Sequence, residues 1–156
     1  MIGPYEEILD SRTFTHSPPG ARHEQICARL HELVRASVAD GKTTCLLAPR
    51  TEVRLSVTTH VRPGLALVTS ATNKLWLAAE IVSSDDHGAD TVIKKEIYEQ
   101  TKLPRLWMVD PRYDNVEVYH GTQYGLVLQG ILAGREVLAE NLLPEFHVTM
   151  AELFSP

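Results

Sequence analysis

The stretch EIVSSDDHGADTVIKKEIYEQTKLPRLWMVDPRYDNVEVY, residues 80–119, decides the fold of this chain. It begins near the end of LWLAAEIV (75–82), a nearly continuous apolar run that is typical of a strand buried on both faces. The polar segment SSDDHGA (83–89) then predicts a loop, and residues from about 90–100 predict a helix. Another buried strand, LWMVD (106–110), follows. This order of strand, helix and strand predicts an α/β fold.

Toward the N-terminus, the pattern predicts an amphipathic helix that begins at Ala21. Its apolar residues recur at three- and four-residue steps and therefore share one face: Ile26, Leu30, Leu33, Val34 and Val38. The pair Asp40-Gly41 predicts the end of this helix, because glycine suits the left-handed cap. Residues 1–20 contain three prolines, so we expect an irregular or extended lead-in with a short strand around 8–14.

Short strands are predicted on both sides of the deciding stretch, from β-branched and alternating apolar runs at 43–48, 52–57, 65–68, 116–119 and 124–129. The last two runs predict an antiparallel hairpin with its turn at His120-Gly121. The segment GREVLAENLLPEF (134–146) predicts one more strand and a loop, with Leu142 and Phe146 available to pack. The sequence shows no linker or internal repeat. We therefore expect one domain over 1–156, with a mixed sheet flanked by helices.

The composition is that of an ordinary globular domain, with 44% hydrophobic and 22% charged residues. The formal net charge of −5 gives no overall attraction to phosphates, so a nucleic-acid binder must gather its positive charge locally. No apolar run approaches the roughly 20 residues that cross a bilayer, and no signal-peptide core is visible. We therefore expect a cytoplasmic protein without membrane contact, in which Cys27 and Cys45 are small buried apolar residues.

Glu80 is the first candidate for chemistry. A carboxylate inside an apolar strand is costly to bury unless it is paired, hydrogen-bonded or bound to a metal. Perturbed carboxylates at strand ends are also typical of hydrolytic sites. The alternative is a structural glutamate that reaches solvent or a lysine partner at the strand end. Both interpretations stay open at this point.

The predicted helix adds candidates, because four-residue spacing places Asp90, Lys94 and Tyr98 on one face. An Asp–Lys pair one turn apart is most often a solvated surface pair. The functional interpretation places the Lys94 ammonium against Glu80, where it would stabilise a developing oxyanion or orient a water molecule. The sequence has neither the H-E-x-x-H zinc spacing nor a glycine-rich phosphate loop, so neither kind of site is supported.

Several residues of the deciding stretch follow one family pattern: Glu80, Ser83, Asp90, Lys94, Tyr98, Trp107, the Val109-Asp110-Pro111 run and the Glu117-Val118-Tyr119 strand. This pattern resembles the Uma-type family of putative restriction endonucleases, a branch of the PD-(D/E)XK nuclease superfamily. The resemblance implies a single restriction-endonuclease-like α/β domain, with a mixed sheet flanked by helices. Outside the stretch, YEEILD (5–10) is similar to the opening strand of that family, and His23 is similar to a histidine that starts its first helix. LLPEFHVTMAELF (142–154) is similar to its closing segment.

The resemblance implies a nuclease that hydrolyses DNA phosphodiesters with a divalent ion, usually Mg²⁺, held by carboxylate oxygens. It implies that Glu80 is both a metal ligand and a catalytic residue. The lysine that normally lies two residues after this glutamate is Val82 here, so Lys94 would be the catalytic lysine, relocated onto the helix. Asp90, Tyr98 and His23 would support the site.

One departure from the family pattern concerns the metal site. The Pro-Asp pair of the family occurs here as Pro63-Gly64, and glycine has no side chain that can ligate a metal. The loss of one of two anionic ligands should weaken a site for a hard cation severely. The carboxylates that would have to substitute are Asp85, Asp86 or Glu7.

Three functions remain open from the sequence. The first is an impaired family member that keeps the scaffold as a DNA-binding or dimeric interaction module. The second is an active Mg²⁺-dependent DNA endonuclease that uses Glu80, Lys94 and a replacement carboxylate, and the third is a domain without a nucleic-acid role. DNA binding would depend on local basic groups, namely Arg50, Arg54, Arg62, Lys94 and Lys95. A homodimer would form through the unprotected edge of the hairpin at 116–129.

Overall fold

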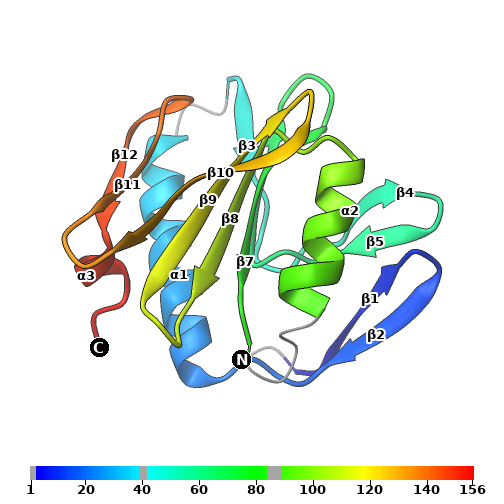
Figure 1. Ribbon diagram of the computed structural model, residues 1–156, viewed down its shortest axis with the longest axis horizontal. Coiled ribbons are helices and arrows are strands. Elements are labelled where there is room, and N and C mark those ends of the chain that lie inside the picture. The colour runs from blue at the N-terminus through cyan, green and yellow to red at the C-terminus, as the bar shows by residue number, and fades with distance from the viewer. Residues whose placement is uncertain (1–2, 39–41, 84–88) are drawn as a thin grey trace.

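The computed structural model describes residues 3–38, 42–83 and 89–156, without the side chains of residues 89–90. Its centre is a six-stranded sheet in the order β10-β9-β8-β7-β6-β3 (Figure 1). These strands are β3 (Thr44–Leu46), β6 (Leu65–Thr69), β7 (Leu75–Ile81), β8 (Arg105–Asp110), β9 (Asn115–Thr122) and β10 (Gly125–Ala133). Neighbouring strands are antiparallel except for β7 and β8, which are parallel. The sheet is therefore mixed, as the sequence predicts.

Helices cover both faces of this sheet (Figure 1). On one face lies α1 (Ala21–Ser37), whose buried apolar residues pack with those of β6 and β7. On the other face lies α2 (Lys94–Gln100), which follows a π-helical turn, η1 (Ala89–Ile93). Because parallel neighbours need a crossover connection, η1 and α2 carry the chain from β7 over that face to β8. None of the helices in the described ranges is long and apolar enough to cross a membrane.

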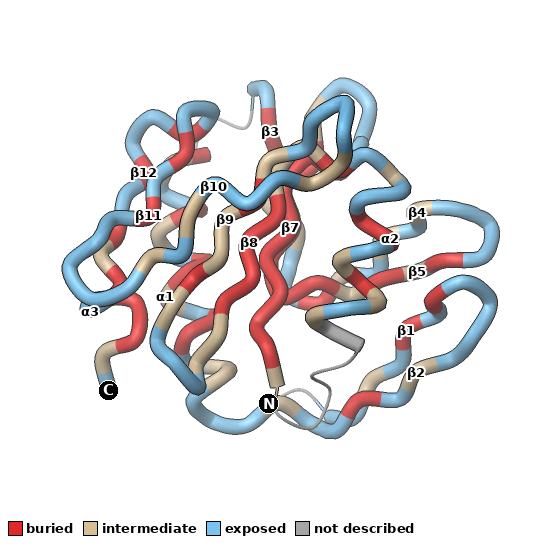
Figure 2. Tube along the Cα trace, viewed as in Figure 1, coloured by how far each residue is buried: buried red, intermediate tan, exposed pale blue. Residues whose placement is uncertain are grey.

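Burial is concentrated in the middle of the sheet, as Figure 2 shows along β7 and β8. Every residue of β7 is buried, and so are the four central residues of β8. Both segments read in the sequence as nearly continuous apolar runs, so the prediction of strands buried on both faces is confirmed. The carboxylate of Glu80 is consequently inside the molecule.

Residues 5–16 form an ordered hairpin within the segment where the sequence predicts an irregular or extended lead-in with a short strand. This hairpin belongs to a second sheet, in the order β2-β1-β5-β4. Its strands are β1 (Tyr5–Leu9), β2 (Arg12–His16), β4 (Val53–Ser56) and β5 (Thr59–Val61). Asp10 and Ser11 both have positive φ, 52° and 66°, as a two-residue type I′ turn requires. Alternation along β1 then buries Glu7 and Leu9.

The turn between β9 and β10 lies three residues later than the sequence predicts. His120 and Gly121 are part of β9, and the turn is formed by Gln123 and Tyr124. A Cβ at position 121 would collide with the carbonyl oxygen of Leu103. The glycine there permits a close approach of two backbones and does not mark a turn, so the prediction of a turn at His120-Gly121 is wrong.

The C-terminal residues form a two-stranded ribbon, β11 (Val137–Glu140) with β12 (Leu143–Thr149), and a short helix, α3 (Met150–Leu153). Phe146 stacks on Trp107 of β8, with ring centroids 5.4 Å apart, and closes the core on the α1 side. The prediction that Phe146 packs is confirmed. Leu142 is 58% exposed, so the same expectation for Leu142 is wrong.

Candidate functional site

Glu80 lies next to the last residue of β7, on the face covered by α2, and only 4% of it is exposed. Its Oε2 accepts a hydrogen bond from the Tyr98 hydroxyl at 2.6 Å. The same oxygen lies 2.6 Å from the ammonium of Lys94. The glutamate therefore does not reach solvent, and its lysine partner is the residue that the functional interpretation placed against it.

One turn of α2 delivers both partners of Glu80. Lys94 and Tyr98 are 1% and 0% exposed, because their four-residue spacing turns both toward the sheet. The alternative of Lys94 as a solvated surface residue is therefore wrong. Asp90, the third member of the predicted helix face, falls in η1, and its side chain lies outside the described residues.

Glu7 brings a second carboxylate to Lys94 from β1. Its Oε2 lies 2.8 Å from the Lys94 ammonium and accepts a hydrogen bond from the backbone N–H of Arg62 at 2.5 Å. Its Oε1 lies 2.8 Å from Nε2 of His16. Glu7 was named from the sequence as a substitute carboxylate, and it does lie beside Glu80. We call Glu7, Glu80, Lys94 and Tyr98 the carboxylate–lysine cluster.

The sequence analysis missed the residues that hold Glu7 in place. His16 is 1% exposed and stacks on the ring of Tyr5, with centroids 4.7 Å apart. The guanidinium of Arg50 lies 5.4 Å from the centre of that Tyr5 ring. The available signal was the alternation of YEEIL, which puts residues 5, 7 and 9 on one face of a strand. A glutamate between an aromatic and a leucine on one face is a buried carboxylate in need of a partner.

The pKa values of the two carboxylates of the cluster are shifted in opposite directions. Burial is the largest influence on Glu80 and leaves its pKa raised, although Lys94 acts in the opposite direction. Burial also acts to raise the pKa of Glu7, but Lys94, His16 and the N–H of Arg62 together lower it to about 2. Burial likewise raises the pKa of Tyr98 well above its ordinary value, so this hydroxyl remains a donor. The cluster therefore holds Glu7 ionised against Lys94 and resists the ionisation of Glu80.

Gly64 immediately precedes β6 and lies opposite Glu80 of β7. The register pairs Leu65 with Ala79, so the next pair outward is Gly64 and Glu80. A Cβ at position 64 would lie 3.4 Å from the carbonyl oxygen of Ala79 and 3.6 Å from Cγ1 and Cδ1 of Ile81. These are ordinary contacts, so an aspartate fits here, although its first neighbours are not the carboxylate of Glu80.

The backbone at Gly64 is fixed by α1. Its carbonyl oxygen lies 2.8 Å from Nε2 of His31 and accepts from the Cys27 thiol at 3.3 Å. His23, also on α1, contacts the carbonyl oxygen of Val82 through Nε2 at 2.7 Å. His23 thus orients the chain just after β7, and among the described residues it has no hydrogen bond to the carboxylate–lysine cluster. Asp85 and Asp86, named as further substitutes, lie outside the described residues.

The described residues do not fit a divalent metal site. Among residues 3–38, 42–83 and 89–156, no group of three or more His, Cys, Asp or Glu side chains is placed to hold a metal ion. The two carboxylates that converge are Glu7 and Glu80, and the cation between them is the ammonium of Lys94. A divalent ion here would have to displace that ammonium or share its ligands.

The basic residues expected to bind DNA do not form one patch. Arg50 is 6% exposed and pairs with Glu24 at 3.1 Å. Arg62 pairs with Glu52 at 2.9 Å, and Lys94 is inside the cluster. Arg54 is exposed on β4, whereas Arg50 lies in a turn before that strand, so the two do not share one sheet face.

The fold is that of a nuclease-like α/β domain. A putative nuclease belonging to DUF820 from Anabaena variabilis ATCC 29413 superimposes with a TM-score of 0.81 at 14% identity, over 97% of this chain and 90% of that chain. The chain belongs to the Uma2 family, described as putative restriction endonucleases, whose model matches residues 4–151. The resemblance drawn from residues 80–119 is therefore confirmed. No curated protein matches the chain.

Proposed function

We propose that this chain is an impaired member of the nuclease family, in which the ammonium group of Lys94 takes the place of the metal ion. The observation that carries the proposal is the position of Lys94, whose Nζ lies 2.6 Å from Glu80 and 2.8 Å from Glu7. The residue opposite Glu80, just before β6, is Gly64, which has no side chain to act as a ligand. Hard divalent cations need several oxygen ligands, and both carboxylates present here already contact the Lys94 ammonium.

A calorimetric titration tests this proposal. Mg²⁺ and Mn²⁺ are added to the purified chain, to Gly64→Asp and to Glu80→Gln, each checked for folding by circular dichroism. We expect no measurable binding to the unaltered chain and a gain of binding in Gly64→Asp, since the substitution fits sterically and adds an oxygen ligand near Glu80. The gained binding should vanish in the double variant Gly64→Asp/Glu80→Gln.

Either of two results contradicts the proposal. Metal binding to the unaltered chain that Glu80→Gln abolishes would show that a complete site exists without Asp at position 64. Failure of Gly64→Asp to gain binding, with the fold intact, would show that Gly64 is not what impairs the site.

The second candidate function is an active Mg²⁺-dependent DNA endonuclease that uses Glu80 and Lys94 as its catalytic residues. One observation favours it: Glu7 and Glu80 converge from different sheets on one cation, which is how a pair of carboxylate ligands would be arranged. Cleavage of a supercoiled plasmid in Mg²⁺, absent in Glu7→Gln, would support this function over the first.

The proposal extends to partners and compartment. DNA is the expected partner because the family is described as putative restriction endonucleases. A homodimer is supported by β10, an edge strand of the six-stranded sheet whose sequence GLVLQGILA has neither a charge nor a proline to discourage pairing. A cytoplasmic setting is consistent with Cys27 and Cys45, which are both free thiols.

A further inference from the structure

A hollow of about 350 Å³ lies on the α2 face of the sheet, next to the carboxylate–lysine cluster. Val82 and Met108 line it and are 1% and 3% exposed, so they form an apolar floor. One wall comes from η1 and α2, and the other comes from the turn between β8 and β9. Sites for small molecules typically have volumes of about 300–1,000 Å³ and combine an apolar lining with a few polar groups. This hollow therefore has room for one nucleotide.

Glu117 is the acceptor in this hollow. Its Oε1 accepts a hydrogen bond from the Tyr119 hydroxyl at 2.7 Å, which fixes the orientation of the carboxylate. Among the described residues, no contact to its other oxygen, Oε2, is found. The register pairs Glu80 with Met108 and Met108 with Glu117, so both glutamates face the same side of the sheet. They are two strands, or about 9–10 Å, apart.

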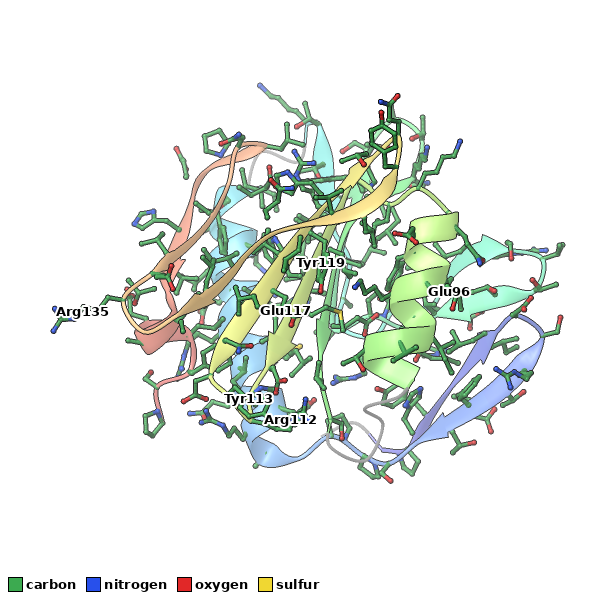
Figure 3. All side chains as sticks on the ribbon, viewed as in Figure 1. Glu96, Arg112, Tyr113, Glu117, Tyr119 and Arg135 are labelled. Atoms are coloured by element: carbon green, nitrogen blue, oxygen red, sulfur yellow. The ribbon has the colours of Figure 1, made fainter. Side chains whose placement is uncertain are left out.

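Cations and aromatic rings form the rim. The Lys95 ammonium lies 4.5 Å from the centre of the Tyr119 ring. The guanidinium of Arg112 is held by two oxygens of Asp110, at 3.0 and 2.8 Å, and lies 5.2 Å from the centre of the Tyr113 ring. Figure 3 shows Arg112 and Tyr113 at the β8–β9 turn, with Glu117 and Tyr119 further along β9.

Tyr113 is the rim residue best placed to contact a ligand, because it lines the hollow and 69% of it is exposed. An aromatic ring next to an oriented guanidinium is a platform on which a base can stack. Stacking is worth about 1–3 kcal/mol per base in proteins that bind single strands. The rim therefore offers stacking, a cation and a carboxylate acceptor within one small site.

We propose that this hollow binds one unpaired guanine nucleotide of a nucleic-acid strand, an inference that rests on the proposed nucleic-acid role. The carboxylate of Glu117 suits a guanine base, which presents adjacent N–H donors on its Watson–Crick edge. Lys95 is placed for a phosphate, and Tyr113 with Arg112 for the face of the base. The next phosphate of the same strand would lie toward Glu80 and Lys94, on the same face of the sheet.

The test is a titration followed by ¹H–¹⁵N NMR in EDTA, with dGMP, with dTMP and with a short single strand that contains one guanine. We expect shifts at Lys95, Arg112 and Glu117, and tighter binding of dGMP than of dTMP. Glu117→Gln should weaken dGMP by about tenfold and dTMP much less, because guanine presents two adjacent N–H donors to the carboxylate and thymine presents one. The matched control is Glu96→Gln, an exposed glutamate of α2 that does not line the hollow. Tyr113→Ala, at an exposed position, should weaken both nucleotides.

Three results would overturn the inference: shifts confined to another surface, equal effects of Glu117→Gln and Glu96→Gln, or binding of dGMP without binding of the strand. The titrations contain no free metal, so they are independent of the calorimetric experiment. Metal binding by the unaltered chain would end the proposal of impairment and leave this site standing. Failure of dGMP to bind would end this inference whatever the metal result.

Discussion

The two faces of the six-stranded sheet are packed in different ways. On the α1 face, aliphatic and aromatic side chains of α1, the central strands and the C-terminal ribbon form one apolar cluster. On the α2 face, a second apolar cluster surrounds buried Glu80 and Lys94, with Glu7 reaching in from the hairpin. The same strands thus support a purely apolar core on one side and, on the other, an apolar core that encloses an ionic cluster, called the ionic core below.

The apolar and ionic parts of the two faces contribute differently to stability. Apolar burial stabilises by roughly 25 cal/mol per Å² of surface removed from water. A buried ion pair does little better than break even, because desolvation of the charges offsets their attraction. The α2 face therefore carries charges that add little to the stability of the fold. We infer that apolar packing on both faces holds the domain together and that the ionic core is confined to the α2 face.

The largest effect is expected from Lys94→Met, which breaks the ionic core and spares the apolar one. Removal of the ammonium leaves Glu7 ionised and buried, and truncation of one partner of a buried pair costs about 3–5 kcal/mol. The double variant Lys94→Met/Glu7→Gln should regain much of that loss, because no unpaired charge remains. Urea unfolding of the single and double variants gives both numbers and their coupling. A double variant no more stable than Lys94→Met would mean that Lys94 acts through packing alone.

On the other face, Leu77→Ala should cost about 2–5 kcal/mol, since Leu77 is fully buried in the α1-side cluster. The loss comes from a cavity, so a second substitution at Glu7 should add to it without coupling. Unfolding in urea of Leu77→Ala, with and without Glu7→Gln, checks this. Coupling as strong as that of Lys94 with Glu7 would show that the two faces do not act separately.

The pH dependence of stability should come from the ionic face. Glu7 has a folded pKa of about 2 against an ordinary 4.5, so it stabilises above pH 4.5 and this contribution is lost as the pH falls through that window. Glu80 has a raised pKa, so its contribution has the opposite sign: the free energy of unfolding falls as the pH rises from 4.5 toward the folded pKa. Each slope is at most about 1.4 kcal/mol per pH unit.

Substitutions separate these two slopes. Glu7→Gln should remove the loss at acid pH, and Glu80→Gln should remove the fall above pH 4.5. Glu6→Gln, an exposed neighbour on β1, is the matched control and should change neither slope. The measurement is urea unfolding at a series of pH values. Identical slopes in all three variants would contradict the assignment of the pH dependence to this cluster.

The parts of this site that could be predicted from the sequence depend on residues that are close together in the chain. The three- and four-residue steps of α1 and the apolar runs of β7 and β8 are local patterns, and the structure follows them. Lys94 and Tyr98 share a helix face one turn apart, so their common direction was also local information. The glutamate they meet precedes the crossover by only a few residues. The pairing of Lys94 with Glu80 was therefore a justified hypothesis.

The contacts that the sequence did not reveal are long-range. Glu7 meets Lys94 across 87 positions of the chain, and that meeting depends on how the N-terminal hairpin docks beside α2. The proline-rich flanks of this hairpin suggested irregular structure, although Asp10 and Ser11 make its turn. At Gly121 the sequence suggested a turn where the structure has a strand, because a close backbone approach and a turn both favour glycine. Tertiary packing decided each of these cases.

The smallest effect on the fold is expected at β10, the edge strand of the six-stranded sheet. Ile131 lies on β10 opposite Glu117, is 51% exposed and belongs to the uncharged edge proposed to pair with a second copy. Ile131→Lys should convert the proposed dimer to a monomer, because a two-fold axis would bring two such charges onto one apolar strip. The unfolding free energy of the monomer should change by no more than about 0.5 kcal/mol, as for an ordinary surface position. Sedimentation equilibrium measures the mass, and Val57→Lys, 80% exposed in the β4–β5 turn, is the matched control. If Ile131→Lys and Val57→Lys have the same mass in solution, β10 is not a dimer interface, and any dimer forms through another surface.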